Sequence, residues 1–390
     1  MTSSTDPSVH DVLAPAAGGA AGRGDEHADL VDAARRLAGT VLAPAAEATD
    51  QASVVPRAHL DALAAAGLNG LSGPRDAGGR DAPAAVVRQV YETLAGACGV
   101  TYFTWVQHHA PVRLLASSGN AALRARWLPE LCGGAVLGGV AFAYLRRPGP
   151  PAVVARPVAG GWIVDGEAPW VTSWGLAGLF AVAARVEGDG PVLFVAVAPA
   201  SAAASASLRA SAPLALAAMS ASATVRLSFE GLFVPDEDVI STVEARRWRE
   251  RDRAATAQPH PAALGLAASA TAMLVRRAEE TGQAAVGRAA ETLGAELAEC
   301  RRQSYRLADD PSAGDAHLAR LVAARAWGLD LALRAAQALV AGTGGGAMAL
   351  SHPAQRLLRE ASFWAIQAQS AAVREATLAR LAPGQRPPSS

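Results

Sequence analysis

The sequence predicts a mainly α-helical protein with a β-rich segment in its middle. Apolar residues recur at helical spacing from about residue 28 to 135 and again from 243 to 382, whereas 136–242 contains short runs rich in Val and Phe between turns. Hydrophobic residues make up 51% of the chain and aromatic residues only 5%, so Ala, Leu and Val must build most of the interior, as in closely packed helices. We therefore expect a helical domain, a β domain and a second helical domain within these bounds.

The first helical region carries amphipathic segments separated by turns. Apolar residues recur at helical spacing in three segments: 30–41, 60–68 and 86–94. The stretch 67–79 is dense in Gly, Pro, Asp and Asn and predicts a loop. Residues 1–27 and 383–390 lack any periodicity and are expected to be disordered tails.

The middle region reads as a compact β domain and the last as a set of long helices. Five short runs predict strands: 153–155, 161–166, 180–186, 192–197 and 225–229. The Ala/Ser-rich run 200–211 lies between two of them and predicts an exposed turn or edge. Four long periodic stretches predict helices: 262–281, 289–306, 315–340 and 353–381.

Charge and composition exclude several classes of function. All 35 basic residues are arginine, so a lysine Schiff base, a Walker-type phosphate lysine and a Ser-x-x-Lys nucleophile pair are excluded. The 35 acidic residues balance them, which leaves no net field to attract nucleic acid or an anionic membrane. The apolar runs are too short to span a membrane and the first 26 residues lack a signal-peptide core, so a cytoplasmic protein is expected.

Two short motifs do not support the binding sites that they suggest, a dinucleotide site and a metal site. Residues 342–347 match the Gly-x-Gly-x-x-Ala dinucleotide pattern, but a helical segment precedes them where a strand is required, so a helix C-terminus explains the glycines. His108 and His109 are neighbours and would point to different faces of a helix. The three cysteines are far apart in the sequence. No metal site or disulfide framework is expected.

A segment in the β region carries a more specific signal. Residues 165–175 place Trp170, Thr172 and Ser173 at the end of an expected strand, and the segment resembles the Gly-x-Lys-x-Trp-Ile-Thr stretch of the acyl-CoA dehydrogenase family. Further similar stretches follow in the same order as in the family: 67–79, 127–134, 229–235, Gly344-Gly345 with Pro353, and Arg359-Glu-Ala361. The resemblance implies an N-terminal helical domain, a middle β-barrel-like domain and a C-terminal four-helix domain.

The resemblance also implies FAD as the cofactor and assigns residues to it. Trp170 and Thr172, with Ser173 following, would lie against the flavin ring, where a fixed dipole can stabilise the charge of the reduced flavin. Ala143 stands at the family's flavin-contacting Thr, so only backbone contacts are expected in that segment. The remaining cofactor contacts implied by the resemblance are at Phe142, Tyr144, Gly344, Gly345 and Ser370.

Several positions depart from the family pattern. Ala368 occupies the place of the glutamate that removes the α-proton, and Ala255 the approximate place of the alternative glutamate, so the catalytic base is unknown. The Gly-Ser-Asp that helps to hold the thioester is replaced by 146–151. The cross-subunit Arg-x-x-Phe-Gly is replaced by 280–287, and its Gln by Ala341.

Three functions remain open at this point. The first is an FAD-dependent oxidoreductase that catalyses α,β-dehydrogenation of an acyl thioester or a related small molecule, with a base from an unexpected position such as Glu360 or Glu375. The second is a flavin-dependent monooxygenase on the same fold, which needs no α-proton base. The third is a non-catalytic partner subunit of a mixed assembly. A homodimer or homotetramer is implied by the resemblance, and the electron acceptor or reduced-flavin donor is unknown.

Overall fold

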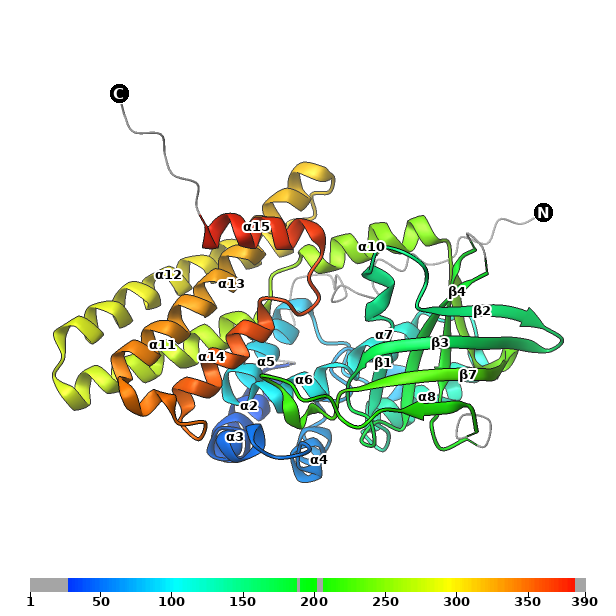
Figure 1. Cartoon of the computed structure of the whole chain (residues 1–390), viewed down its shortest axis with the longest axis horizontal. Coiled ribbons are helices and arrows are strands. Elements are labelled where there is room, and N and C mark those ends of the chain that lie inside the picture. Colours follow the sequence, from blue (N-terminus) through cyan, green and yellow to red (C-terminus); the bar gives the residue numbers. More distant parts are fainter. Residues whose placement is uncertain (1–26, 188–189, 202–205, 383–390) are drawn as a thin grey trace.

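The computed structural model describes residues 27–187, 190–201 and 206–382, and its first part is helical (Figure 1). The helices, with one π-helical turn, are α2 (Ala28–Leu37), η1 (Ala38–Leu42), α3 (Ala43–Asp50), α4 (Arg57–Ala65), α5 (Ala84–Ala97), α6 (Gly99–Val106), α7 (His109–Ala116) and α8 (Ala121–Gly133). The side chain of Asn120 accepts from the amide of Leu123 and starts α8, and Gly134 in the left-handed conformation ends it. Apart from His27, both predicted tails lie outside the described residues.

The middle part is one twisted sheet. Its strands are β1 (Gly138–Ala141), β2 (Val153–Val158), β3 (Gly161–Val171), β4 (Leu179–Val186), β5 (Val192–Val197), β6 (Leu208–Ala210), β7 (Val225–Pro235) and β8 (Val239–Val243). The order is β6-β7-β3-β2-β4-β5-β8, and β1 pairs in parallel with β4. The five predicted strands are present, whereas β1 and β8 were missed and the edge strand β6 falls within the predicted turn or edge.

The two faces of the sheet have separate cores because successive side chains of a strand point to opposite sides. On β4, Val182 and Ala184 pack within the sheet domain. Ala181 and Ala183 face α7 and α8 of the first helical part. The β-rich middle is thus attached to the N-terminal helices through a continuous apolar layer.

The last part is helical and consists of α10 (Ala245–Ala257), α11 (Pro261–Thr281), α12 (Ala284–Asp309), α13 (Asp315–Thr343), α14 (Pro353–Trp364) and α15 (Ala371–Leu381). Of these, α11, α12, α13 and α14 lie side by side at one end of the molecule (Figure 1). The predicted single helix 353–381 is wrong, because the chain leaves the helix after Trp364 and Ala368 adopts φ 49°. Otherwise the predicted class, mainly α with a central β domain, is confirmed.

The described residues contain neither a membrane-spanning helix nor a cluster of metal ligands. None of the helices described is long and apolar enough to cross a membrane. Within the same part of the chain, no three His, Cys, Asp or Glu side chains lie close enough together to hold a metal ion.

Candidate functional site

The connection between α14 and α15 separates two cavities, and Ala368 lies at its centre. Gln367 lines one cavity, whereas Gln369 and Ser370 line the other. Ser370 also caps α15, since its side chain accepts from the amide of Val373 at 3.3 Å. The left-handed conformation of Ala368 is strained for a residue with a side chain, so the tertiary structure must hold this turn in place.

The first cavity, here called the arginine cavity, has a volume of about 680 Å³ and lies between the β domain, α10 and the start of α15. It brings Tyr144 and Ser370, two of the predicted cofactor residues, to one place. Arg146 binds Asp252 with two hydrogen bonds, from Nη2 at 2.6 Å and from Nε at 2.9 Å. Six arginines line the arginine cavity: Arg146, Arg147, Arg185, Arg249, Arg253 and Arg374. This set of donors suits a ligand with phosphate groups.

The second cavity, here called the aromatic cavity, is smaller, at about 250 Å³. Its lining combines ring-bearing side chains with polar ones: Tyr91, Tyr102, His260, Trp364, Arg325 and Gln367. Burial lowers the pKa of His260 to about 3, and the charge of Arg325 adds to the effect. The imidazole is therefore neutral, and because Nδ1 accepts from the amide of Ala263, Nε2 donates to Oε1 of Gln367 at 3.1 Å. Neither ring nitrogen is available as a base.

The predicted flavin-facing segment at the end of β3 exposes its indole but not its hydroxyls. Trp170 is 52% exposed and has φ 63°, at an irregularity in the pairing of β3 with β7. The hydroxyl of Thr172 lies 3.1 Å from that of Thr224, and Ser173 donates to the carbonyl of Thr104 on α6 at 3.1 Å. Trp170 can therefore cover a planar ligand, whereas the two hydroxyls already have partners.

The side chains of Phe142 and Tyr144 are buried inside the protein. Phe142 packs edge-on against Phe194, with ring centroids 5.9 Å apart. The hydroxyl of Tyr144 donates to the carbonyl of Ala141 at 2.8 Å and also contacts the carbonyl of Ala183, and burial raises the pKa of Tyr144. That this segment offers a cofactor mainly its backbone remains a prediction.

Comparison with known proteins shows similarity to acyl-CoA dehydrogenases. Residues 24–135 match the model for the N-terminal domain of acyl-CoA dehydrogenases. A curated relative, benzylmalonyl-CoA dehydrogenase of Aromatoleum aromaticum, is 26% identical over 224 residues, which span 56% of this chain and 58% of that enzyme. The structure of butyryl-CoA dehydrogenase from Megasphaera elsdenii superposes with a TM-score of 0.78 and 18% identity, over 93% of this chain and all of that one. The first helical part is thus similar to the N-terminal domain of acyl-CoA dehydrogenases, and the described chain has the fold of these enzymes. The same fold also occurs in dibenzothiophene monooxygenase from Paenibacillus sp. A11-2, with a TM-score of 0.74, 16% identity and coverage of 92% and 98%.

The glycine pair that the family resemblance assigned to FAD lines neither cavity. Gly344 ends α13 with φ 80°, and a Cβ at Gly344 or Gly345 would meet no heavy atom within 4 Å. Nineteen helical residues separate Gly344 from Arg325, which is about 28 Å along the axis of α13. Within one chain, these glycines and Arg325 cannot contact the same part of a ligand.

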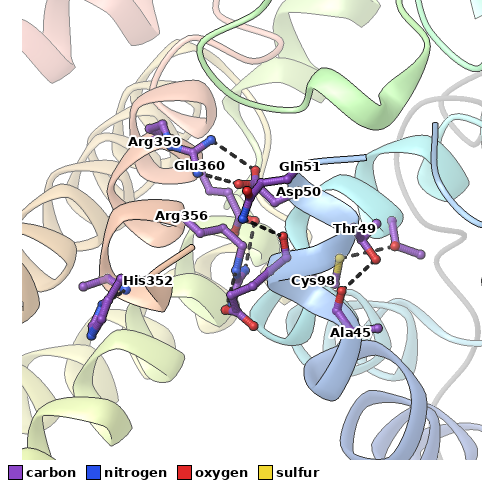
Figure 2. A network of polar contacts seen from close by, with 12 residues as sticks. Ala45, Thr49, Asp50, Gln51, Cys98, His352, Arg356, Arg359 and Glu360 are labelled. Carbon is purple, nitrogen blue, oxygen red and sulfur yellow. Dashed lines mark hydrogen bonds and ion pairs between the residues drawn. The ribbon is translucent and has the colours of Figure 1, made fainter. Parts of the chain in front are cut away.

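The family-like Arg359-Glu-Ala361 motif joins the first and last helical parts (Figure 2). Arg359 binds Asp50 at 3.1 Å. Buried Arg356 binds both Glu360, at 2.9 Å, and Glu47, at 3.1 Å. Burial raises the pKa of Glu360, although the charge of Arg356 opposes this. Glu360 is thus a structural partner of Arg356, and neither it nor the exposed Glu375 lines a cavity.

Sequence reasoning missed the polar residues of the aromatic cavity and Asp252. Arg325 and Gln367 lie in helical or loop segments that read as surface in the sequence, and His260 carried no motif. The approximate alignment of Ala255 with the family's alternative glutamate was the one available signal, because Asp252 precedes it by three residues and shares its helix face.

Proposed function

We propose that this chain is an FAD-dependent oxidoreductase. The observation that carries the proposal is the arginine cavity, since six arginines surround a space beside Tyr144 and Ser370 that suits a phosphate-bearing cofactor or substrate. The exposed indole of Trp170 suits the planar ring of the cofactor. When bound, FAD would supply a two-electron acceptor for the substrate. The arginines and the indole together support FAD as the cofactor.

Within this proposal, α,β-dehydrogenation of an acyl thioester or related substrate is the first candidate reaction. It requires a base, and Asp252 is the carboxylate among the described residues that line the arginine cavity. Asp252 lies one helical turn before Ala255, so it occupies the face of α10 on which the alternative base is expected. The chain would hold the acyl group near α10 and transfer the proton to Oδ1 or Oδ2 of Asp252.

Monooxygenation is the second candidate, and the ion pair of Asp252 favours it. Both carboxylate oxygens accept from Arg146, at 2.6 and 2.9 Å, and a carboxylate held in this way is a weak base. Oxygenation would leave this pair intact, because no α-proton has to be removed. The Paenibacillus monooxygenase has the same fold, so the architecture accommodates either reaction.

We also propose that the active form is an oligomer. The glycine pair at the end of α13 is open and lies about 28 Å from Arg325, so it suits a contact with the cofactor of a neighbouring subunit. A homodimer or homotetramer satisfies this, and so does a mixed assembly with a complete relative.

A visible absorption spectrum of the purified chain, with and without added FAD, tests the proposal. We expect a yellow protein that retains FAD through gel filtration. A colourless protein that takes up no FAD would leave the partner-subunit function and contradict both enzyme candidates.

Anaerobic mixing of the yellow protein with a panel of acyl-CoA thioesters distinguishes the two reactions. Bleaching by a thioester that is lost in Asp252→Asn supports dehydrogenation through Asp252. Bleaching only by a flavin reductase, unaltered by Asp252→Asn, supports monooxygenation. Asp61→Asn is the matched control, because Asp61 is exposed on α4 and lines neither cavity.

A further inference from the structure

Arg325 is a buried cation in the wall of the aromatic cavity. It lies on α13, and only 5% of its surface is exposed. Its Nη1 donates to the carbonyl of Gln258 at 3.1 Å and its Nη2 to the carbonyl of Gln367 at 3.0 Å. These two bonds use two of its five N–H groups, and Nε has no acceptor in the described part of the chain.

No carboxylate balances the charge of Arg325. Among the described residues, no Asp or Glu lies within 4.0 Å of its guanidinium. Burial lowers its pKa to about 10, and the like charge of Arg146 adds to the effect, so Arg325 remains a cation at neutral pH. Arg356, which is also buried, contacts two glutamates. A buried charge without a counterion is costly, and an anion entering the cavity would offset that cost.

The remaining charges around the aromatic cavity do not supply the missing anion. Its lining contains three arginines and, among the described residues, neither Asp nor Glu. Arg88 is neutralised from outside the lining by Asp309, whose two oxygens both lie 2.7 Å from Nη2. His260 is neutral, as its pKa of about 3 requires. The charged side chains that line the cavity are therefore all arginines, Arg88, Arg113 and Arg325.

The walls of the cavity suit a single aromatic ring. Tyr102 lies between Tyr91 and Trp364, with centroid distances of 5.6 and 5.9 Å and edge-on geometry. Aromatic side chains favour offset or edge-on contacts with another ring. At about 250 Å³ the cavity is below the roughly 300–1,000 Å³ of drug-sized pockets, so its occupant must be small.

Gln367 supplies a second donor near the cation. Because Oε1 accepts from Nε2 of His260, the amide nitrogen of Gln367 faces away from that bond and has no partner among the residues described. A carboxylate can accept from this amide and from the guanidinium of Arg325 together.

We propose that the aromatic cavity binds a small aromatic acid, with the free carboxylate of the acid paired to Arg325 and its ring against the wall formed by Tyr91, Tyr102 and Trp364. Binding of the acid is proposed independently of the oxidoreductase function. If that function holds, the acid is the substrate, and the cavity beside the α14–α15 connection takes a free acid in addition to or instead of a CoA thioester.

Isothermal titration of the full chain with phenylacetate and with its neutral analogue phenylacetamide tests the proposal. We expect saturable binding of phenylacetate that is about tenfold or more tighter than that of phenylacetamide, since the two differ mainly in the charge that Arg325 would pair. Equal affinities, or no saturable binding of phenylacetate up to about 10 mM, would overturn it.

Variants on α13 locate the effect. Arg325→Gln should abolish the preference for the acid and Arg325→Lys should retain part of it, whereas Arg320→Gln, an exposed position on the same helix, should leave the preference unchanged. An unchanged preference in folded Arg325→Gln would refute the assignment, and if that variant does not fold, the wild-type comparison decides. A colourless protein that still prefers the acid would support this inference while contradicting the oxidoreductase proposal.

Discussion

Gly265 near the start of α11 lies directly against the backbone of α5, and replacing it with alanine tests this helix contact. A Cβ at this position would lie 2.2 Å from the carbonyl oxygen and 2.9 Å from the carbonyl carbon of Glu92. In the opposite direction, a Cβ at Gly96 would lie 2.7 Å from the carbonyl oxygen of Gly265. Because these are backbone atoms of a packed helix, α5 and α11 must move apart to accept a methyl group.

Two opposing effects decide the size of the change. Alanine is favoured over glycine inside a helix by about 1 kcal/mol. The methyl group needs about 1.2 Å more space to reach the 3.4 Å of an ordinary contact, and overpacking of this kind costs about 1–3 kcal/mol. Because the nearest atoms belong to the backbone, the overpacking cost should be about 2–3 kcal/mol, so we expect Gly265→Ala to lower the free energy of unfolding by about 1–2 kcal/mol, measured by urea denaturation followed by circular dichroism.

Gly294→Ala is the matched control, because Gly294 is also inside a helix. A methyl group there would have Cγ2 of Thr271 as its nearest neighbour, at 3.6 Å, so helix propensity should dominate and raise stability by up to about 1 kcal/mol.

Gly265→Ala should also weaken phenylacetate binding, since α5 carries Tyr91 and α11 begins beside His260. If Gly265→Ala were as stable as Gly294→Ala, the close contact between α5 and α11 would be refuted.

Three further predictions concern the cofactor, protonation and the buried ion pairs. Trp170→Ala should change stability by less than about 0.5 kcal/mol, because the indole is 52% exposed, but should weaken FAD binding several-fold in a spectroscopic titration. Burial lowers the pKa of His260 to about 3 and of His108 to about 4, so lowering the pH from 7.5 to 5.5 should cost about 1.4 kcal/mol for each in urea unfolding. The unfolded chain takes up protons below pH 6.5, so greater stability at pH 5.5 would contradict this. Gly99→Ala would place a methyl 2.6 Å from the carboxylate of Glu360 and should destabilise the chain by about 1–3 kcal/mol, and thermal unfolding unchanged from wild type would contradict the packing.

The order of helical and β segments could be predicted because each has its own hydrophobic period. The missed strands are short, and β1 begins with two glycines, which weaken any strand signal. The break between α14 and α15 was hidden for another reason, since alanine favours a helix and gives no local sign of the left-handed conformation at Ala368. Ser370, which caps α15, was the available signal for a new helix start.

The site could be predicted only in part, because burial and pairing depend on contacts between distant segments. The motif at Trp170 was visible in the sequence, but the internal partners of Thr172 and Ser173 come from residues 52 and 69 positions away. Arg325 reads as an ordinary helical arginine until α13 is placed against α10 and the α14–α15 connection. Its lack of a carboxylate partner is a property of the fold.

The alanine at 368 and the unpaired charge of Arg325 are consistent with a single change in ligand chemistry. Arg325 donates to the carbonyl of Gln367, so a glutamate side chain at the next residue would come within reach of the guanidinium and neutralise it. Alanine leaves that charge for a carboxylate carried by the ligand. Ala368→Glu should therefore abolish the preference for phenylacetate over phenylacetamide in the titration, whereas Ala368→Gln, of the same size but uncharged, should retain it. Retention of the preference in Ala368→Glu would show that residue 368 and Arg325 act independently.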